Sequence, residues 1–169
     1  NRIATLDPFC IGIEMEANKP GWNDSMNGLP GILGSSLCQT LELERAFRFL
    51  YSNISELFKN EEDTILIYEE LYEFINKIEI CLSEFLNSND PKRTYIYWDS
   101  SHTIKESYRK KTIFGISGNE KKIKIMELKS FLQKSILMLS GIFSSENHDK
   151  VFSKDEVIYT YIENIVTKF

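Results

Sequence analysis

The stretch NKPGWNDSMNGLPGILGSS, residues 18–36, divides a short extended N-terminal part of the chain from a long helical part. Glycine and proline crowd into it, and neither a helical nor a strand periodicity of apolar residues runs through it, which predicts a long irregular loop. The same stretch holds a tryptophan, an aspartate and three asparagines. Long ordered loops that end at a helix often carry functional residues, so we expect a site here.

Asp24 is the residue of this stretch with the most direct chemical use. In one interpretation, Trp22-Asn23-Asp24 is a structural turn in which Asn23 and Asp24 bond to their own backbone and Trp22 anchors the turn against the core. In the other interpretation Asp24 is a general acid, because a carboxyl group beside an indole in a poorly hydrated cleft has a raised pKa. The residue types alone leave both interpretations open.

The string Trp22–Gly28, followed by Gly34–Ser36, resembles the Trp-Asn-Asp segment of cellobiose-phosphorylase-like proteins. These are inverting carbohydrate-active enzymes built on an (α/α)6 barrel, and over Glu16–Asp24 the string is most similar to long members of the group. The resemblance implies that Asp24 is the general acid. The family segment usually opens Gly-Asp-Trp-Asn-Asp, whereas this chain has Pro20-Gly21 before the tryptophan.

The resemblance also implies a reaction, which is cleavage or phosphorolysis of a glycosidic bond with inversion. Asp24 would protonate the departing oxygen; a second carboxylate would activate water in a hydrolase, whereas inorganic phosphate would attack as co-substrate in a phosphorylase, and no other cofactor is expected. From the residue chemistry we expect Trp22 to stack on a sugar ring, and Asn23 and Asn27 to bond its hydroxyl groups. Glu16 would face the same cleft, although such a carboxylate is more often simply solvated.

Composition and charge argue against several other classes. The 169 residues suit one domain, and 42% hydrophobic with 27% charged residues is typical of a soluble globular protein. The net charge of −5 at pH 7 argues against nucleic acid as a partner, and no stretch is apolar for long enough to span a membrane. The three cysteines, Cys10, Cys38 and Cys81, match no metal or redox spacing, so we expect reduced thiols in a cytoplasmic protein.

The elements of the chain are predicted from the spacing of its apolar residues. Alternation at Phe9, Ile11, Ile13 and Met15 predicts an extended N-terminal segment, with Glu14 and Glu16 on its other face. Apolar stripes and capping residues predict helices from Ser36 to about residue 59, over about 61–86, from Ser100 or Ser101 to about 111, over about 126–143, and from Ser153 onward. Short extended runs are expected at Tyr95–Trp98 and at 121–125.

Two further groups of polar residues receive a structural interpretation. His102 and His148 have no ligand-like neighbours in the sequence, so we assign them neither a metal nor a catalytic role. The basic cluster Lys105, Arg109, Lys110 and Lys111 fits either a phosphate site or a solvated helix face, and the acidic balance of the whole chain favours the solvated face.

These elements predict a mainly α fold made of antiparallel helical hairpins. The short link inside 36–87 predicts one such hairpin, which is the repeating unit of an (α/α)6 barrel and equally of any helical bundle. We expect one helical region over 1–169, a partial catalytic domain with the extended segment and acid-bearing loop in 1–35, the hairpin in 36–87 and further helices in 92–169. A barrel needs more helices than this chain offers, so we expect a fragment of a longer chain, inactive alone.

The expected partners follow from these interpretations. They are an oligosaccharide or glucoside substrate, the remainder of the parent chain, and a second copy of the fragment through helix faces left uncovered; neither nucleic acid nor a membrane is expected. The rival hypothesis is a non-enzymatic helical interaction domain with a structural Trp-Asn-Asp turn. Two features argue for this rival: the helix predicted over 61–86 is apolar over much of its circumference, and the last predicted helix has no stop signal.

Overall fold

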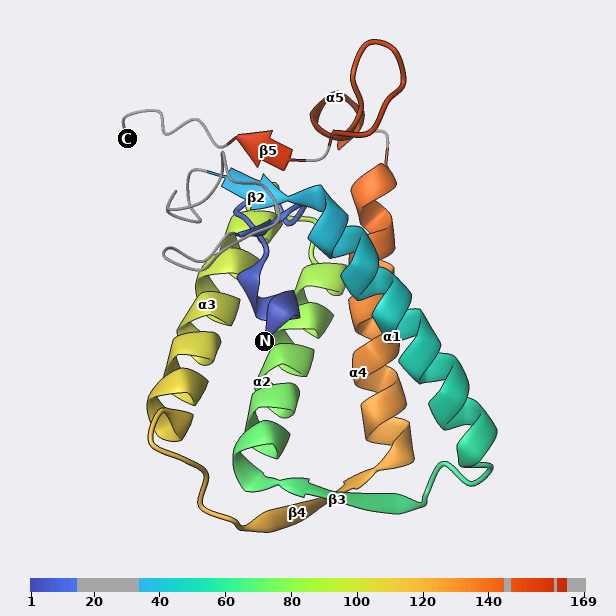
Figure 1. Ribbon diagram of the computed structural model, residues 1–169, viewed down its shortest axis with the longest axis vertical. Coiled ribbons are helices and arrows are strands. Elements are labelled where there is room, and N and C mark those ends of the chain that lie inside the picture. Colours follow the sequence, from blue (N-terminus) through green and yellow to red (C-terminus); the bar gives the residue numbers. More distant parts are fainter. Residues whose placement is uncertain (15–33, 145–146, 160, 164–169) are drawn as a thin grey trace.

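The computed structural model describes residues 1–14, 34–144, 147–159 and, for the backbone, 161–163. The described part is mainly helical, with two small antiparallel sheets (Figure 1). In chain order its elements are η1 (Arg2–Thr5), β1 (Ile13–Glu14), β2 (Gly34–Ser36), α1 (Leu37–Leu57), β3 (Thr64–Tyr68), α2 (Glu69–Asn87), α3 (Arg93–Thr112), β4 (Glu120–Lys124), α4 (Ile125–Ser140), η4 (Gly141–Phe143), α5 (His148–Val151) and β5 (Tyr161–Glu163).

Four long helices lie side by side between the two sheets, in the order α3, α2, α4, α1 (Figure 1). Helices α1 and α3 run toward the β3–β4 sheet, whereas α2 and α4 start from it, so the pairs α2–α3 and α1–α4 are antiparallel. The sheet at the opposite end has the strand order β1-β2-β5. None of the helices in the described residues combines the length and the apolar character that crossing a membrane requires.

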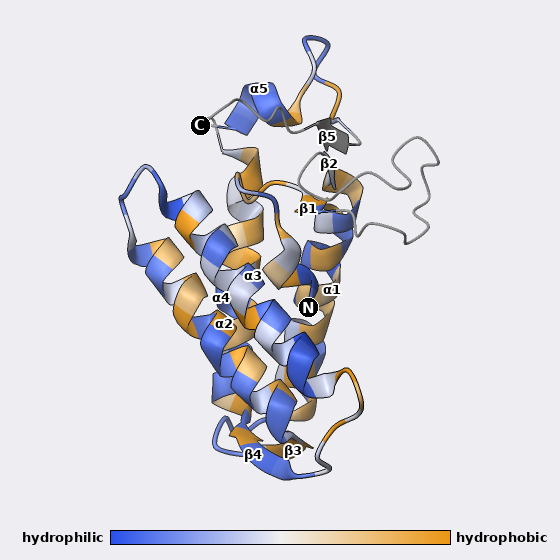
Figure 2. Cartoon of the chain, turned by 90° about the vertical axis from the view of Figure 1, so that its left-hand side faces the viewer, coloured by the Kyte–Doolittle hydropathy of each residue, from blue (hydrophilic) through white to orange (hydrophobic). Residues whose placement is uncertain are grey.

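The core forms chiefly because α2 and α4 each bury an apolar stripe, and Figure 2 shows hydrophilic and hydrophobic bands alternating along the helices. The buried stripes of α2 and α4 lie side by side, and the N-terminal residues fill the space beside them at the β1-β2-β5 end. Tyr97 of α3 links the helices to the N-terminal residues, because its ring is buried and its hydroxyl donates a hydrogen bond to the carbonyl oxygen of Ile3 at 3.0 Å.

The sequence prediction for residues 61–86 is wrong in its first part, because Thr64–Tyr68 is strand β3. This strand pairs with β4, an extended run that the sequence did predict, and the pairing joins Thr64 to Lys124 and Tyr68 to Glu120. Ile65 and Ile67 are half-buried while Thr64, Leu66 and Tyr68 are exposed, which is the alternation of a strand. The sequence does not reveal this alternation, because residues 65–67 are all apolar. The expected hairpin over 36–87 is therefore not formed: β3 separates α1 from α2, and α4 lies between them.

Two other predicted elements differ from the structure. Tyr95–Trp98 belongs to helix α3, because the helical phase places Tyr97 in the core, which outweighs the β propensity of the run. The helix expected from Ser153 is absent from the described residues up to Glu163. Instead the Ser153 hydroxyl accepts the N–H groups of Asp155 and Val157 in a turn, and Tyr161–Glu163 pairs with β2.

Other predictions are confirmed. Ser36 caps α1 by accepting the N–H of Gln39 at 3.3 Å, as the spacing of the two residues indicates. The helix expected over 126–143 is α4 followed by the 3-10 turn η4. In the N-terminal extended segment only Ile13–Glu14 is a strand, and Met15 lies outside the described residues.

Residues 7–12 form a turn, called the N-terminal turn below, which is held by Asp7. The side chain of Asp7 is fully buried. Its Oδ1 accepts the N–H groups of Phe9 and Ile11, each at 3.0 Å, and its Oδ2 accepts the N–H of Gly12 at 3.0 Å and the hydroxyl of Ser35 at 2.6 Å. Burial raises the pKa of Asp7, and these hydrogen bonds oppose the rise. Because Ser35 lies in β2, one carboxyl group ties the N-terminal turn to that strand.

Gly12 permits the close approach of the turn to β2. A Cβ atom at this position would lie 2.2 Å from the Oγ and 2.6 Å from the Cβ of Ser35. Ser35 cannot rotate away without losing its bond to Asp7, so only glycine fits without a shift of the backbone.

We therefore expect Gly12→Ala to lower the free energy of unfolding by about 1–3 kcal/mol, as overpacking does in a close-packed site. Chemical denaturation followed by circular dichroism measures this change. The matched control is Gly141→Ala, because a Cβ there meets no atom within 4 Å. Equal stabilities of the two variants would contradict the close contact.

Candidate functional site

The residues that the sequence predicts as the site, Glu16, Trp22, Asn23, Asp24 and Asn27, all lie outside the described residues. The structure therefore does not report whether they come together. It does describe the two ends from which the segment 15–33 starts and returns. These ends are Glu14 in β1 and Gly34 in β2.

The two ends of the segment are fixed side by side by strand pairing. Ile13 pairs with Ser36 and Glu14 pairs with Ser35 in an antiparallel register, and β5 pairs with the other edge of β2. The Asp7 carboxyl group bonds to Ser35 from the N-terminal turn. The backbone at both ends of the segment is thus held in the β1-β2-β5 sheet.

Glu14 is the best-anchored carboxylate near the segment, and its partners come from helix α3. Its Oε1 accepts the indole N–H of Trp98 at 2.8 Å, and its Oε2 lies 2.8 Å from Nε2 of His102. The side chains of Glu14 and His102 are 13% and 20% exposed, so this contact is largely shielded from water. Trp98 and His102 are one helical turn apart, which places both rings on one face of α3.

His102 lies between two hydrogen-bonding partners. Its Nδ1 is 2.9 Å from the carbonyl oxygen of Trp98, and its Nε2 is 2.8 Å from Oε2 of Glu14. These contacts hold the imidazole ring beside Glu14, the last described residue before the segment.

The aromatic rings of Tyr95, Trp98 and His102 follow one another along α3. The ring centroids of Tyr95 and Trp98 lie 5.4 Å apart, and those of Trp98 and His102 lie 5.2 Å apart. A shallow groove of about 460 Å³ runs from Trp98 and His102 toward Lys110. We call Tyr95, Trp98 and His102 the α3 aromatic row; it offers flat apolar faces beside a carboxylate, hydroxyl groups and a cation.

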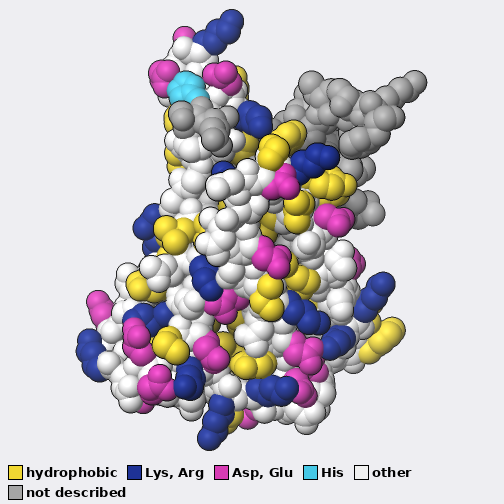
Figure 3. Space-filling view, turned by 180° about the vertical axis from the view of Figure 1, so that it is seen from behind, with side chains coloured by type: hydrophobic (Ala, Val, Ile, Leu, Met, Phe, Trp, Pro, Cys, Tyr) yellow, Lys and Arg dark blue, Asp and Glu magenta, His cyan; other side chains and the backbone are white. Residues whose placement is uncertain are grey.

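The basic cluster of α3 does not form a phosphate site. Lys105 is buried and lies 3.9 Å from Glu106, Arg109 is 3.4 Å from Glu106, and Lys111 bonds to Glu73 of α2, which raises the pKa of that lysine. On the face that Figure 3 shows, basic and acidic side chains are interspersed rather than gathered by sign. Ion pairs engage Lys105, Arg109 and Lys111, while Lys110 lines the groove that starts at Trp98 and His102.

Sequence reasoning missed the role of His102. Its carboxylate partner is 88 residues earlier in the chain, so no local spacing reveals the pair. The signal that was present is the spacing Tyr95, Trp98 and His102, which places three rings on one face once the region is recognised as helix. Among the described residues no group of three or more His, Cys, Asp and Glu side chains is arranged to hold a metal ion.

Comparison with known proteins adds no assignment: no protein-family model matches the sequence, and no curated protein matches it.

The anchoring of Glu14 can be tested by Glu14→Ala. This change leaves the indole N–H of Trp98 and Nε2 of His102 without their partner, so we expect a loss of about 1–3 kcal/mol in the free energy of unfolding. The indole N–H resonance of Trp98 should also move in a proton–nitrogen NMR spectrum.

The control for that experiment is Glu106→Ala on the same groove. Glu106 is 52% exposed and pairs with Arg109 at the surface, so its removal should change the stability little. If the two variants were equally stable and the Trp98 resonance stayed in place, the anchoring role of Glu14 would be refuted.

Proposed function

We propose that this chain carries the acid-bearing part of an inverting carbohydrate-active enzyme that cleaves or phosphorolyses a glycosidic bond. Asp24 is the general acid, and the departing sugar oxygen receives its proton. The proposal starts from the resemblance of Trp22–Gly28 to the Trp-Asn-Asp segment of cellobiose-phosphorylase-like proteins. The structural observation that carries it further is the fixing of both ends of residues 15–33 beside the α3 aromatic row.

The fixed ends support the proposal because a catalytic carboxyl group needs a defined position. General-acid catalysis requires the acid within hydrogen-bond distance of the leaving oxygen. Strand pairing holds the residues at the two ends of segment 15–33 in register, and Glu14 ties the first end to α3.

The α3 aromatic row supports a sugar as the substrate. The apolar face of an aromatic ring suits the C–H face of a pyranose, while hydroxyl and carboxylate groups at its edge accept or donate to the sugar hydroxyls. In the proposal Trp22, Asn23, Asn27 and Glu16 complete the substrate site from the segment 15–33. Inorganic phosphate is the co-substrate if the enzyme is a phosphorylase, and water is the acceptor if it is a hydrolase.

The proposed scaffold is an (α/α)6 barrel to which this chain contributes one part. The antiparallel pair α2–α3, whose helices follow each other in the chain, is the kind of unit that such a barrel repeats. The remaining helices and the rest of the sugar site would come from further segments of a parent chain, so 1–169 alone would be inactive. The three cysteines, which form no disulfide, agree with a cytoplasmic enzyme.

The decisive variant is Asp24→Asn in the full natural chain that contains these residues. An amide cannot donate the acid proton, so we expect kcat to fall about 10²- to 10⁴-fold with little change in stability. The assay measures release of sugar phosphate or reducing sugar from β-linked glucosides, with and without inorganic phosphate. Asp149→Asn, at an exposed carboxylate of α5, is the control; an unchanged kcat in Asp24→Asn would overturn the assignment.

A second variant tests the α3 aromatic row. Tyr95 is 50% exposed, and its ring extends the row beyond Trp98. We expect Tyr95→Ala to raise KM about 3- to 10-fold with kcat retained, since a stacking contact contributes to binding rather than to proton transfer. Ile96→Ala is the matched control, because Ile96 is 48% exposed and is absent from the row.

One observation favours a second candidate, a non-enzymatic helical interaction domain. Large apolar side chains are exposed on α1 and on the connection after α3: Phe49 at 65%, Leu57 at 76%, Ile113 at 71% and Phe114 at 99%. Apolar surface of this kind marks contacts with other proteins, with further segments of a longer chain or with a second copy. In this alternative the Trp-Asn-Asp turn is structural, and Asp24→Asn changes no turnover.

A further inference from the structure

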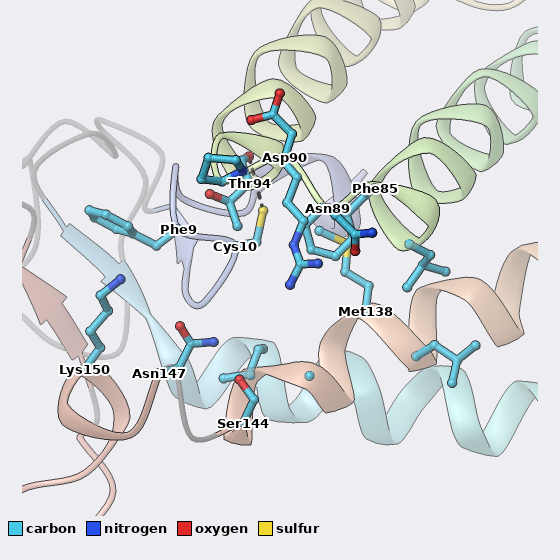
Figure 4. A pocket seen from close by; sticks show the side chains of 16 residues that line it. Phe9, Cys10, Phe85, Asn89, Asp90, Thr94, Met138, Ser144, Asn147 and Lys150 are labelled. Atoms are coloured by element: carbon cyan, nitrogen blue, oxygen red, sulfur yellow. Dashed lines mark hydrogen bonds between the residues drawn. The ribbon is translucent and has the colours of Figure 1, made fainter.

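A cavity of about 540 Å³ is lined in part by Phe9 and Cys10 of the N-terminal turn and includes no residue of the α3 aromatic row. It opens between the end of α2, the start of α3, the end of α4 and the residues around α5 (Figure 4). Its volume is within the range of pockets that hold small organic molecules. Segments from five parts of the chain meet there, so the cavity is a product of the tertiary fold.

The cavity has an apolar inner wall within a lining whose exposed surface is mostly polar. Met138 and Ile142 are 4% and 2% exposed and line it from α4 and η4, and the ring of Phe85 lines it from α2. Phe9 stands at the rim and is 44% exposed. Such a wall suits an aromatic or short aliphatic body, because burying apolar surface there is favourable.

The opening of the cavity carries positive charge. The Lys150 ammonium lies 4.3 Å from the centroid of the Phe9 ring, and among the described residues it has no carboxylate partner. Arg93 lies 5.4 Å from the Phe85 ring centroid and donates a hydrogen bond to the carbonyl oxygen of Ser88. Both cations are therefore oriented by aromatic rings that themselves line the cavity.

The lining also contains one carboxylate and two side-chain amides. Asp90 is the one carboxylate among the described lining residues, and its Oδ1 is engaged by the backbone N–H of Lys92 at 2.8 Å. The side-chain amides of Asn89 and Asn147 have no hydrogen-bond partner within the described chain, and Figure 4 shows them on opposite sides of the cavity. The lining thus offers the Lys150 ammonium and two uncommitted amides against one carboxylate, Asp90, that is already bonded.

We propose that this cavity binds a small amphipathic organic anion, with a phosphate or carboxylate at Lys150 and an apolar body against Phe85, Met138 and Ile142. Cys10 also lines the cavity, but its role is structural. Its thiol donates to the carbonyl oxygen of Thr94 at 3.4 Å, and burial together with the charge of Asp7 raises its pKa, which keeps the thiol protonated and unreactive.

The test uses phenyl phosphate as the probe, with binding followed by calorimetry and by NMR shifts of lining residues. The blocking variant is Gly141→Leu, because Gly141 lines the cavity and a Cβ there meets no atom within 4 Å, so the new side chain enters open space. We expect the unmodified chain to bind the probe and Gly141→Leu to lose measurable binding. Gln133→Leu, on an exposed part of α4 away from the lining, should bind as the unmodified chain does.

The two halves of the ligand are tested separately. Lys150→Gln should weaken binding of phenyl phosphate about 3- to 10-fold through loss of a charge-assisted contact, whereas Lys154→Gln, at an exposed lysine outside the lining, should not. Phenol, which lacks the anion, and inorganic phosphate, which lacks the body, should each bind at least 10-fold more weakly than phenyl phosphate.

Three results would overturn the proposal. They are no binding of phenyl phosphate to the unmodified chain, equal binding by Gly141→Leu with an unchanged melting temperature, and equal binding of phenol or inorganic phosphate. Because Tyr95, Trp98 and His102 do not line this cavity, binding of phenyl phosphate is measured separately from the assay of glycosidic cleavage.

Discussion

The Asp7 carboxyl group holds the N-terminal turn to strand β2 through four hydrogen bonds, three from backbone N–H groups and one from the hydroxyl of Ser35. Burying a carboxyl group costs free energy unless its oxygens are satisfied, and here every donor comes from the turn or from the strand beside it. The buried carboxyl group therefore has its hydrogen bonds satisfied in only this backbone arrangement. If the turn moved, the carboxyl group would lose its partners in a site closed to water.

This arrangement places β1 and β2 next to each other and thereby defines where residues 15–33 begin and end. Glu14 then joins β1 to α3 through Trp98 and His102, and the hydroxyl of Tyr97 joins α3 to Ile3. The N-terminal residues therefore act as a bridge between α3 and β2 rather than as a loose end. The proposed chemistry of Asp24 depends on this bridge, because a proton donor must return to the same position at every turnover.

The sequence predicted the helices with clear caps and one-sided stripes, such as α1 from Ser36 and α4 from near residue 126. It failed where distant pairing decides the structure. The apolar run Ile65–Ile67 fits a helix or a strand equally well, and only its partner, β4, selects the strand. For Tyr95–Trp98 the local β propensity pointed the wrong way, because packing of Tyr97 in the core requires a helix.

The candidate site was predictable only in part for the same reason. The Trp-Asn-Asp string is contiguous and can be recognised from the sequence, whereas the pair Glu14–His102 joins residues that are 88 positions apart. The cavity near Lys150 is assembled from five separate segments, and no single one of them carries a motif. Constellations of this type depend on the tertiary fold and become visible only once the helices are packed.

Helix α1 is anchored unevenly, and this has a consequence for motion. Of its 21 residues only Leu37 and Thr40 are buried, both in the first turn, while the rest lies on α4 through partly buried side chains such as Phe47. We therefore expect the outer turns of α1 to open by local unfolding and to exchange their amide hydrogens long before α2 does. The anchored first turn lies between these outer turns and β2, so α1 can open at its far end while the strand that Asp7 holds stays in place.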